Sequence, residues 1–286
     1  MPHRLPLVFA HGNGIPRQVY QKMLIGLSHR FVATGVDRFG HDPAYPVTDS
    51  WPRLIDQLRA HIAAVGEPVT LLGHGTGGWL NLLAAYRAPE LVTAVLMLDA
   101  PLPTIAQARL LAALKRVGLG DLPGRVCGAS ADLPAFDAEC QALYRRFGGR
   151  PADAFASGRS RDAEPRRFDG EVGRRIQQTF PTGLAALVEK GPPVDGSGRI
   201  VPCGMLIGRR SRAAHLCGLA ATRHLVADKL VVIEGSHLFP LELPLVTAKE
   251  VVRLHDRMIG VDPASSFPGW RKAARTKASA QLQPTA

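Results

Sequence analysis

The sequence is poor in the residues and motifs that mark several common protein classes. It contains only four cysteines, none in a CxxC pair or in a zinc-type pattern with histidine: Cys127, Cys140, Cys203 and Cys217. In a chain of 286 residues this spacing predicts reduced thiols and no metal site. The chain also has no GxGxxG or P-loop sequence, so we expect neither a nucleotide nor any other cofactor.

Long hydrophobic runs are missing as well. No stretch is long and apolar enough to cross a bilayer, which predicts a protein without a membrane span. The N-terminal sequence MPHRLPLVFAHGNG has a short apolar run that ends in His and Gly, with no small-residue cleavage site. It predicts a first core strand and no signal peptide, and we expect a cytoplasmic protein.

Acidic residues are fewer than basic ones. The chain has 24 Asp and Glu against 35 Lys and Arg, a formal net charge of +11, which by itself would fit an acidic partner or nucleic acid. The excess is mostly scattered arginine and no recognition module accompanies it, so we expect a small-molecule substrate or ligand and no nucleic acid. The basic end, residues 263–286, lacks apolar periodicity and is predicted to be a disordered tail.

Short apolar runs alternate with helical segments in the first third of the chain. Strands are predicted at residues 5–10, 31–37, 68–72 and 91–101. The helix after Ser50, which is its predicted N-cap, has one apolar face made by Leu54, Ile55, Leu58 and Ile62. This order predicts an α/β fold with a mainly parallel sheet and helices on both faces.

The alternation stops after Pro101 and resumes near Ile200. The residues between them include helical patches such as IAQARLLAALKRV but no convincing strand. Further strands are predicted at 200–208 and 228–235, followed by a closing helix at 244–260. The sequence therefore predicts an α/β core made of residues 1–101 and 200–262, interrupted by a helical cap at 102–199.

Three loops that follow predicted strands carry residues suited to chemistry. They are AHGNGIP at 10–16, GHGTGG at 73–78 and EGSHLFP at 234–240. Because the carboxyl ends of parallel strands lie along one edge of a sheet, where ligands bind, we expect these loops to converge.

With these loops in this order, the chain resembles the α/β-hydrolase fold superfamily. It looks most like bacterial hydrolases with HGNG near the start, DRFGHDP after the next strand and GSHLFPLE near the end; the resemblance covers residues 5–259. It implies the α/β-hydrolase fold with an inserted helical cap, and descent from serine hydrolases that act on carboxylic esters or similar small acyl substrates. Superfamily members usually have an antiparallel strand pair before the HG loop, but only ten residues precede His11, so we expect a trimmed core or a truncated start.

The resemblance places Gly75 where the family has its nucleophilic serine. The tip of this strand-to-helix turn has a strained backbone with positive φ, and small neighbours let the strand and helix approach closely. The backbone N–H of Thr76, just after the tip, would face an oxyanion. The resemblance implies a second donor from the first loop, best placed at Asn13.

His237 is the predicted general base, because it follows the last strand where the superfamily places its catalytic histidine. No Asp or Glu occurs from residue 200 to 227, which excludes the usual loop for the acid that orients this histidine. Asp99 occupies an alternative position that some members use, and it could hold His237 in the required tautomer. The alternative for Asp99 is a structural role, as a helix cap or in a hydrogen bond to the cap domain.

We expect no other residue to replace the missing nucleophile. The nearby candidates are Thr76, Ser236, Ser211 and Cys203, and none has the strand–turn–helix setting that exposes a hydroxyl to a base.

Three hypotheses about function stay open on the sequence alone. The first is a serine hydrolase by descent in which Gly75 abolishes covalent catalysis, either as an inactivated copy or as a deliberate knock-out. The second is a ligand-binding or regulatory protein without chemistry. The third hypothesis is that His237 and Asp99 act as a general base without a covalent intermediate.

Overall fold

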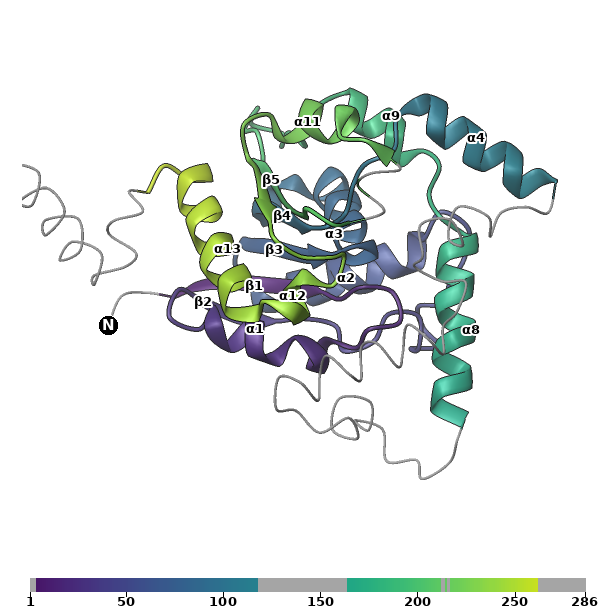
Figure 1. Cartoon of the computed structure of the whole chain (residues 1–286), viewed down its shortest axis with the longest axis horizontal. Coiled ribbons are helices and arrows are strands. Elements are labelled where there is room, and N and C mark those ends of the chain that lie inside the picture. Colours follow the sequence, from purple (N-terminus) through teal and green to yellow (C-terminus); the bar gives the residue numbers. More distant parts are fainter. Residues whose placement is uncertain (1–3, 118–163, 212–213, 215–216, 262–286) are drawn as a thin grey trace, which may run out of the picture.

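A computed structural model describes residues 4–117, 164–211, 214 and 217–261 (Figure 1). The predicted tail at 263–286 and the middle of the predicted cap, residues 118–163, lie outside the described residues. Within the described ranges, no helix has the length and hydropathy needed to cross a membrane.

The described residues form one sheet of six strands, all paired in parallel, in the order β2-β1-β3-β4-β5-β6. The strands are β1 (Leu5–Ala10), β2 (Phe31–Thr34), β3 (Val69–His74), β4 (Val92–Leu98), β5 (Cys203–Gly208) and β6 (Leu230–Ile233). The central strands β3 and β5 are buried along their whole length. This confirms the prediction of a parallel sheet, as expected for continuous apolar strands.

Helices cover both faces of the sheet, and alternation along the strands assigns each face its own core. Val8 and Ala10 of β1 pack in the core beneath α2 (Pro52–Val65) and α3 (Thr76–Arg87). Leu7 and Phe9 pack on the opposite face, beneath η1 (Arg17–Tyr20), α1 (Gln21–Gly26), α12 (Phe239–Glu242) and α13 (Pro244–Met258). The sheet is therefore covered on both faces, as the sequence predicts, and Figure 1 shows α1, α12 and α13 together on one face.

Helices make up most of the described parts of the predicted cap. These are α4 (Ile105–Arg116), α8 (Glu164–Gln178) and α9 (Leu184–Glu189), and residues 104–117 and 164–190 contribute no strand to the sheet. The C-terminal half of α8 docks on loops of the core, where Trp51 Nε1 donates to the Ile176 carbonyl at 2.8 Å. Figure 1 shows α8 beside the strand ends, away from the N-terminus. The boundaries of a separate cap stay a prediction.

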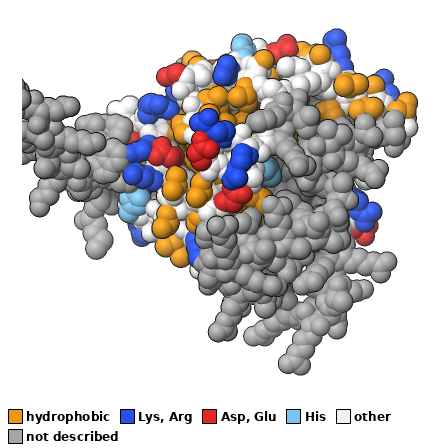
Figure 2. Space-filling model, in the orientation of Figure 1, with side chains coloured by type: hydrophobic (Ala, Val, Ile, Leu, Met, Phe, Trp, Pro, Cys, Tyr) orange, Lys and Arg blue, Asp and Glu red, His pale blue; other side chains and the backbone are white. Residues whose placement is uncertain are grey.

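One short 3-10 helix and one α-helix complete the described core. The short η2 (Pro89–Leu91) leads into β4, and α11 (Ala220–Val226) connects β5 to β6. In the coloured part of the face in Figure 2, acidic, basic and hydrophobic side chains are interspersed.

Several local predictions need correction. The apolar face of α2 is buried as predicted, but Ser50 is not its N-cap: the helix begins at Pro52 after Trp51, which has φ 59° and caps nothing with its side chain. The left-handed turn places the Trp51 indole under α8, and the Ser50 N–H instead donates to the Thr179 carbonyl. Burial of the indole therefore takes the place of a polar cap.

Four strands are shorter than predicted, namely β2, β4, β5 and β6. β2 ends at Thr34 because the following segment bonds to another loop, with the Arg17 N–H donating to the Asp37 carbonyl. β5 begins at Cys203 because Pro202 has no N–H for the ladder, and Ile200 instead forms an isolated antiparallel bridge with Val194.

Candidate active site

Gly75 forms the tip of a sharp turn between β3 and α3. Its backbone has φ 50° and ψ −116°, a conformation that side-chain-bearing residues rarely adopt. The turn is held by the Gly75 N–H, which donates to the Leu98 carbonyl at 2.8 Å, and by the Gly78 N–H, which donates to the Gly75 carbonyl at 2.9 Å. The tip is thereby fixed to the end of the neighbouring strand β4.

The neighbouring glycines give this turn its room. A Cβ at Gly73 would collide with the Gly77 backbone, and a Cβ at Gly77 would collide with the Ala10 carbonyl. A Cβ at Gly78 would lie only 2.7 Å from the Ala100 side chain. The close approach of strand and helix therefore depends on small residues, as the sequence analysis expected.

His237 and Asp99 are hydrogen-bonded to each other. His237 Nδ1 lies 2.7 Å from Asp99 Oδ2, and the Asp99 carboxylate is 1 % exposed whereas His237 is partly open to solvent. Because a carboxylate only accepts hydrogen bonds, Nδ1 carries the hydrogen and the neutral ring keeps its lone pair on Nε2. This tautomer is the one that a general base requires.

Two other groups fix the Asp99 carboxylate. The Gly208 N–H donates to Oδ1 at 2.9 Å, and the Ser211 hydroxyl donates to Oδ2 at 2.5 Å. Ser211 Oγ also accepts the Ala214 N–H at 3.2 Å, so both its hydrogen and a lone pair are engaged. Asp99 itself has φ 46° at the end of β4, a conformation that aspartate tolerates better than most residues.

The direction of the missing side chain at Gly75 is defined by its backbone. A Cβ built there would lie 3.3 Å from Cε1 and 3.5 Å from Nε2 of His237. Position 75 thus faces the ring nitrogen that Asp99 leaves free.

The two predicted oxyanion donors lie in the first loop and at the start of α3. Within the described residues, the backbone N–H groups of Asn13 and Thr76 donate to no other protein group. The Asn13 side chain is engaged, because its Nδ2 donates to the Gly173 carbonyl of α8 at 2.8 Å, while its Oδ1 is buried without a partner there. The roles of Asn13 and Thr76 in an oxyanion site stay a prediction.

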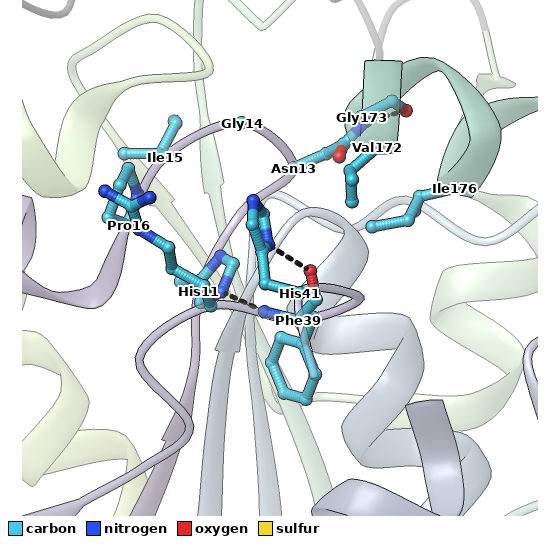
Figure 3. Close-up of a pocket in the computed structure, with 11 residues that line it drawn as sticks. His11, Asn13, Gly14, Ile15, Pro16, Phe39, His41, Val172, Gly173 and Ile176 are labelled. Atoms are coloured by element: carbon cyan, nitrogen blue, oxygen red, sulfur yellow. Dashed lines mark hydrogen bonds between the residues drawn. The ribbon is translucent and has the colours of Figure 1, made fainter. Parts of the chain in front are cut away.

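A small hollow lies beneath the first loop and α8, and Figure 3 shows the Asn13 side chain directed at Gly173 there. It is large enough for about one water molecule. The DRFGHDP loop forms its floor: the Phe39 N–H donates to His11 Nε2, and His41 Nδ1 donates to the Phe39 carbonyl, each at 3.0 Å. These contacts give that loop a structural role.

Three of the four candidates for a replacement nucleophile are either hydrogen-bonded to another side chain or held in an unreactive state. Ser211 is buried against Asp99, and the Ser236 hydroxyl donates to Glu242 at 2.6 Å. Burial raises the pKa of the Cys203 thiol to about 12, which disfavours its thiolate. In the described part of the chain, no group of three His, Cys, Asp or Glu residues could hold a metal ion.

His74 and Tyr20 belong to this site but were missed by the sequence analysis. The His74 ring lies directly before the tip, and its centroid is 4.5 Å from that of His237. Burial, and next the charge of nearby His237, lowers the pKa of His74 to about 3, so its ring is neutral. The sequence contained one signal for His74, namely a histidine at the end of an otherwise apolar strand. Alternation along that strand places His74 on the same face as Leu72.

Comparison with known proteins gives one family. Residues 7–253 match the model of the Alpha/beta hydrolase family. A 2-(acetamidomethylene)succinate hydrolase from Mesorhizobium japonicum is 26% identical over 259 residues, and the match covers 87% of each chain.

Solved structures show the same fold at lower identity. E-2-(acetamidomethylene)succinate hydrolase has 23% identity and a TM-score of 0.56, over 88% of this chain and 91% of that chain. Potato epoxide hydrolase I has 16% identity and a TM-score of 0.59, over 89% of this chain and 93% of that chain. The family match runs from β1 into α13 and includes the turn at Gly75, Asp99 and His237. The chain therefore belongs to the alpha/beta hydrolase family.

Proposed function

We propose that this chain descends from serine hydrolases of carboxylic esters or similar small acyl compounds, and that it no longer forms an acyl-enzyme. The observation that carries the proposal is the direction in which a side chain at position 75 would point. Its missing side chain would point at the free nitrogen of His237, which is paired with Asp99. This arrangement supports the proposal that Asp99 and His237 served a nucleophile at position 75 that the chain no longer has.

The arrangement suits acyl transfer in every other respect. In a serine hydrolase the histidine takes the proton of the hydroxyl, and backbone N–H groups stabilise the oxyanion. The N–H groups of Asn13 and Thr76 are main-chain donors, so the loss of a side chain at position 75 does not remove them. Loss of one triad member costs several powers of ten in turnover, which excludes fast covalent catalysis by this chain.

The similarity to the Mesorhizobium relative suggests the first compounds to test. That relative is named for the hydrolysis of an acetamido derivative of a dicarboxylate. We therefore propose small acidic amides, alongside simple esters, as ligands for this site.

A second candidate function is base catalysis without a covalent intermediate. The observation that favours it is the intact pair itself: His237 keeps its hydrogen on Nδ1 and its lone pair on the side of the empty tip. A water molecule next to Gly75 would be within reach of this lone pair. The base would then activate water directly, in place of the serine hydroxyl.

Mass spectrometry of the protein after incubation with an aryl ester separates these functions. The proposal expects no acyl adduct and negligible turnover for the parent chain, and an adduct on residue 75 in Gly75→Ser. Turnover by the parent that disappears in His237→Ala would support base catalysis instead. An adduct on the parent chain would refute both.

A different result is that the parent chain and a folded Gly75→Ser variant both show no adduct and no turnover. This result would support the ligand-binding hypothesis. The chain would then be a ligand-binding member of the family, and calorimetric titration with the same acidic amides would measure that binding.

A further inference from the structure

His74 donates a hydrogen bond to the backbone of the residue that carries the base. Its Nε2 lies 2.9 Å from the His237 carbonyl oxygen, which can only accept, so Nε2 carries the hydrogen. In the neutral ring Nδ1 is then an acceptor, and the Tyr20 hydroxyl lies 2.7 Å from it. The tautomer of this buried histidine is therefore fixed from both sides.

Tyr20 extends the same chain of bonds to the first loop. Its hydroxyl hydrogen is given to His74, and its oxygen accepts the Gly12 N–H at 3.2 Å. Gly12 directly precedes Asn13, the predicted oxyanion donor. The bonds thus run in one direction, from Gly12 through Tyr20 and His74 to the His237 carbonyl.

The packing around this chain of bonds is tight. Tyr20 is 1 % exposed and His74 is fully buried. A Cβ at Gly12 would lie 2.7 Å from His74 Nδ1 and 2.9 Å from the Tyr20 hydroxyl, directly on their hydrogen bond. The glycine of the HGNG sequence is therefore required by the same contacts, which is an independent sign that the three groups are fitted to one another.

We infer that Tyr20 and His74 are positioning residues, which hold the loop of His237 and the loop of Asn13 in a fixed relation to each other. The chain of bonds joins the backbones of the two loops, so it sets where the base and the predicted oxyanion donor lie. Neither residue is placed to take part in the chemistry, because both ring nitrogens of His74 and both sides of the Tyr20 hydroxyl are occupied.

This positioning is especially important with glycine at position 75. No side chain at the tip contacts the His237 ring from that side, so the ring is held through Asp99 and through the backbone that His74 fixes. The inference rests on the proposed function for its catalytic meaning, but the geometry is open to measurement without any turnover.

Nuclear magnetic resonance of the folded full chain tests the geometry. The signals of the His237 ring, identified by their loss in His237→Asn, and of the Asn13 amide are followed in Tyr20→Phe, His74→Leu and His74→Gln. Glutamine can donate to the His237 carbonyl and accept from Tyr20, so His74→Gln should retain most of the parent signals. Tyr20→Phe and His74→Leu should shift both the ring titration of His237 and the Asn13 amide.

Tyr86→Phe is the matched control. It removes the partly buried hydroxyl of Tyr86, which lies near the C-terminal end of α3 and donates to the Gly191 carbonyl at 2.6 Å, and it should leave both signals unchanged. Unchanged His237 and Asn13 signals in a folded Tyr20→Phe would overturn the inference. Should His74→Leu fail to fold, the nearly isosteric Tyr20→Phe still decides the question.

Kinetics adds a readout that depends on the proposed function. In a Gly75→Ser background, Tyr20→Phe should lower kcat by roughly tenfold with little change in KM, as expected for loss of one buried hydrogen bond that matters in the transition state. An inactive Gly75→Ser chain would count against the proposed function alone, because the resonance measurement is independent of it. Equal kcat values with and without Tyr20→Phe would count against the positioning role.

Discussion

A serine at position 75 would place a hydroxyl between the base and the predicted oxyanion donors. The Cβ of such a residue would lie 3.3 Å from Cε1 of His237, so the ring must move by only a few tenths of an ångström. The hydroxyl oxygen then falls near Nε2, which lies 3.5 Å from the Cβ and already carries the lone pair. The change therefore supplies a nucleophile to a base that is already oriented.

The substitution also has a cost in stability. A non-glycine residue at φ 50° and ψ −116° is strained by about 1–3 kcal/mol. Gly75→Ala carries the same Cβ and the same strain without the hydroxyl, so it is the control for both fold and activity. Both variants should unfold at a lower temperature than the parent and by a similar amount.

The assay is hydrolysis of short aryl esters by the parent chain, Gly75→Ala and Gly75→Ser. We expect kcat/KM of the serine variant to exceed that of the alanine variant by at least about a hundredfold, roughly 2.7 kcal/mol in the barrier. The gain should vanish when His237→Ala is added. Equal rates for folded serine and alanine variants would refute the reasoning, because the tip would then not face a working base.

Three further predictions follow from Asp99, His74 and Cys203. In the Gly75→Ser background, Asp99→Asn should lower kcat by roughly 10³–10⁴, because an amide cannot hold the His237 tautomer, and ester hydrolysis with a folded variant measures this; a loss below tenfold would remove Asp99 from the site. The pKa of His74 is lowered to about 3 in the folded protein, from about 6.5 in an unfolded chain. Between these two pH values, His74 therefore carries a proton in the unfolded chain but not in the folded protein. The free energy of unfolding should therefore fall by about 2 kcal/mol from pH 7 to pH 5 through this group, and denaturant titrations should show a smaller fall in His74→Gln; identical slopes would contradict the assignment. Cys203, with its pKa raised to about 12 and its side chain buried, should resist iodoacetamide at pH 8 until the chain unfolds, as peptide mass mapping would show, and rapid labelling of the folded protein would contradict its burial.

The fold could be predicted from the sequence because its signals are local. The four apolar positions of α2 recur at helical spacing, and each is buried in the structure: Leu54, Ile55, Leu58 and Ile62. The continuous apolar strands likewise predicted a parallel sheet. The errors occur where a distant contact decides the local structure, as at Trp51, whose indole bonds to Ile176 in α8, 125 residues away in sequence.

The candidate site was predictable only in part, for the same reason. His237 and Asp99 could be proposed from their places after strands, and the structure brings them within 2.7 Å. Tyr20 and His74 could not, because their bond joins residues 54 positions apart and no motif marks the tyrosine. Ser211 was considered as a nucleophile, whereas it donates to Asp99, and only the tertiary arrangement reveals that direction.

The placement of Asp99 at the end of β4 has a consequence for how the site responds to heat. The tip and the acid belong to neighbouring strands joined by the Gly75 N–H to Leu98 bond, so their spacing follows the register of the central sheet. His237 instead lies on a loop after the edge strand β6, partly open to solvent. Because edge loops open locally at lower free energy than central strands, warming should first release the base, while the spacing of tip and acid persists until the sheet itself unfolds.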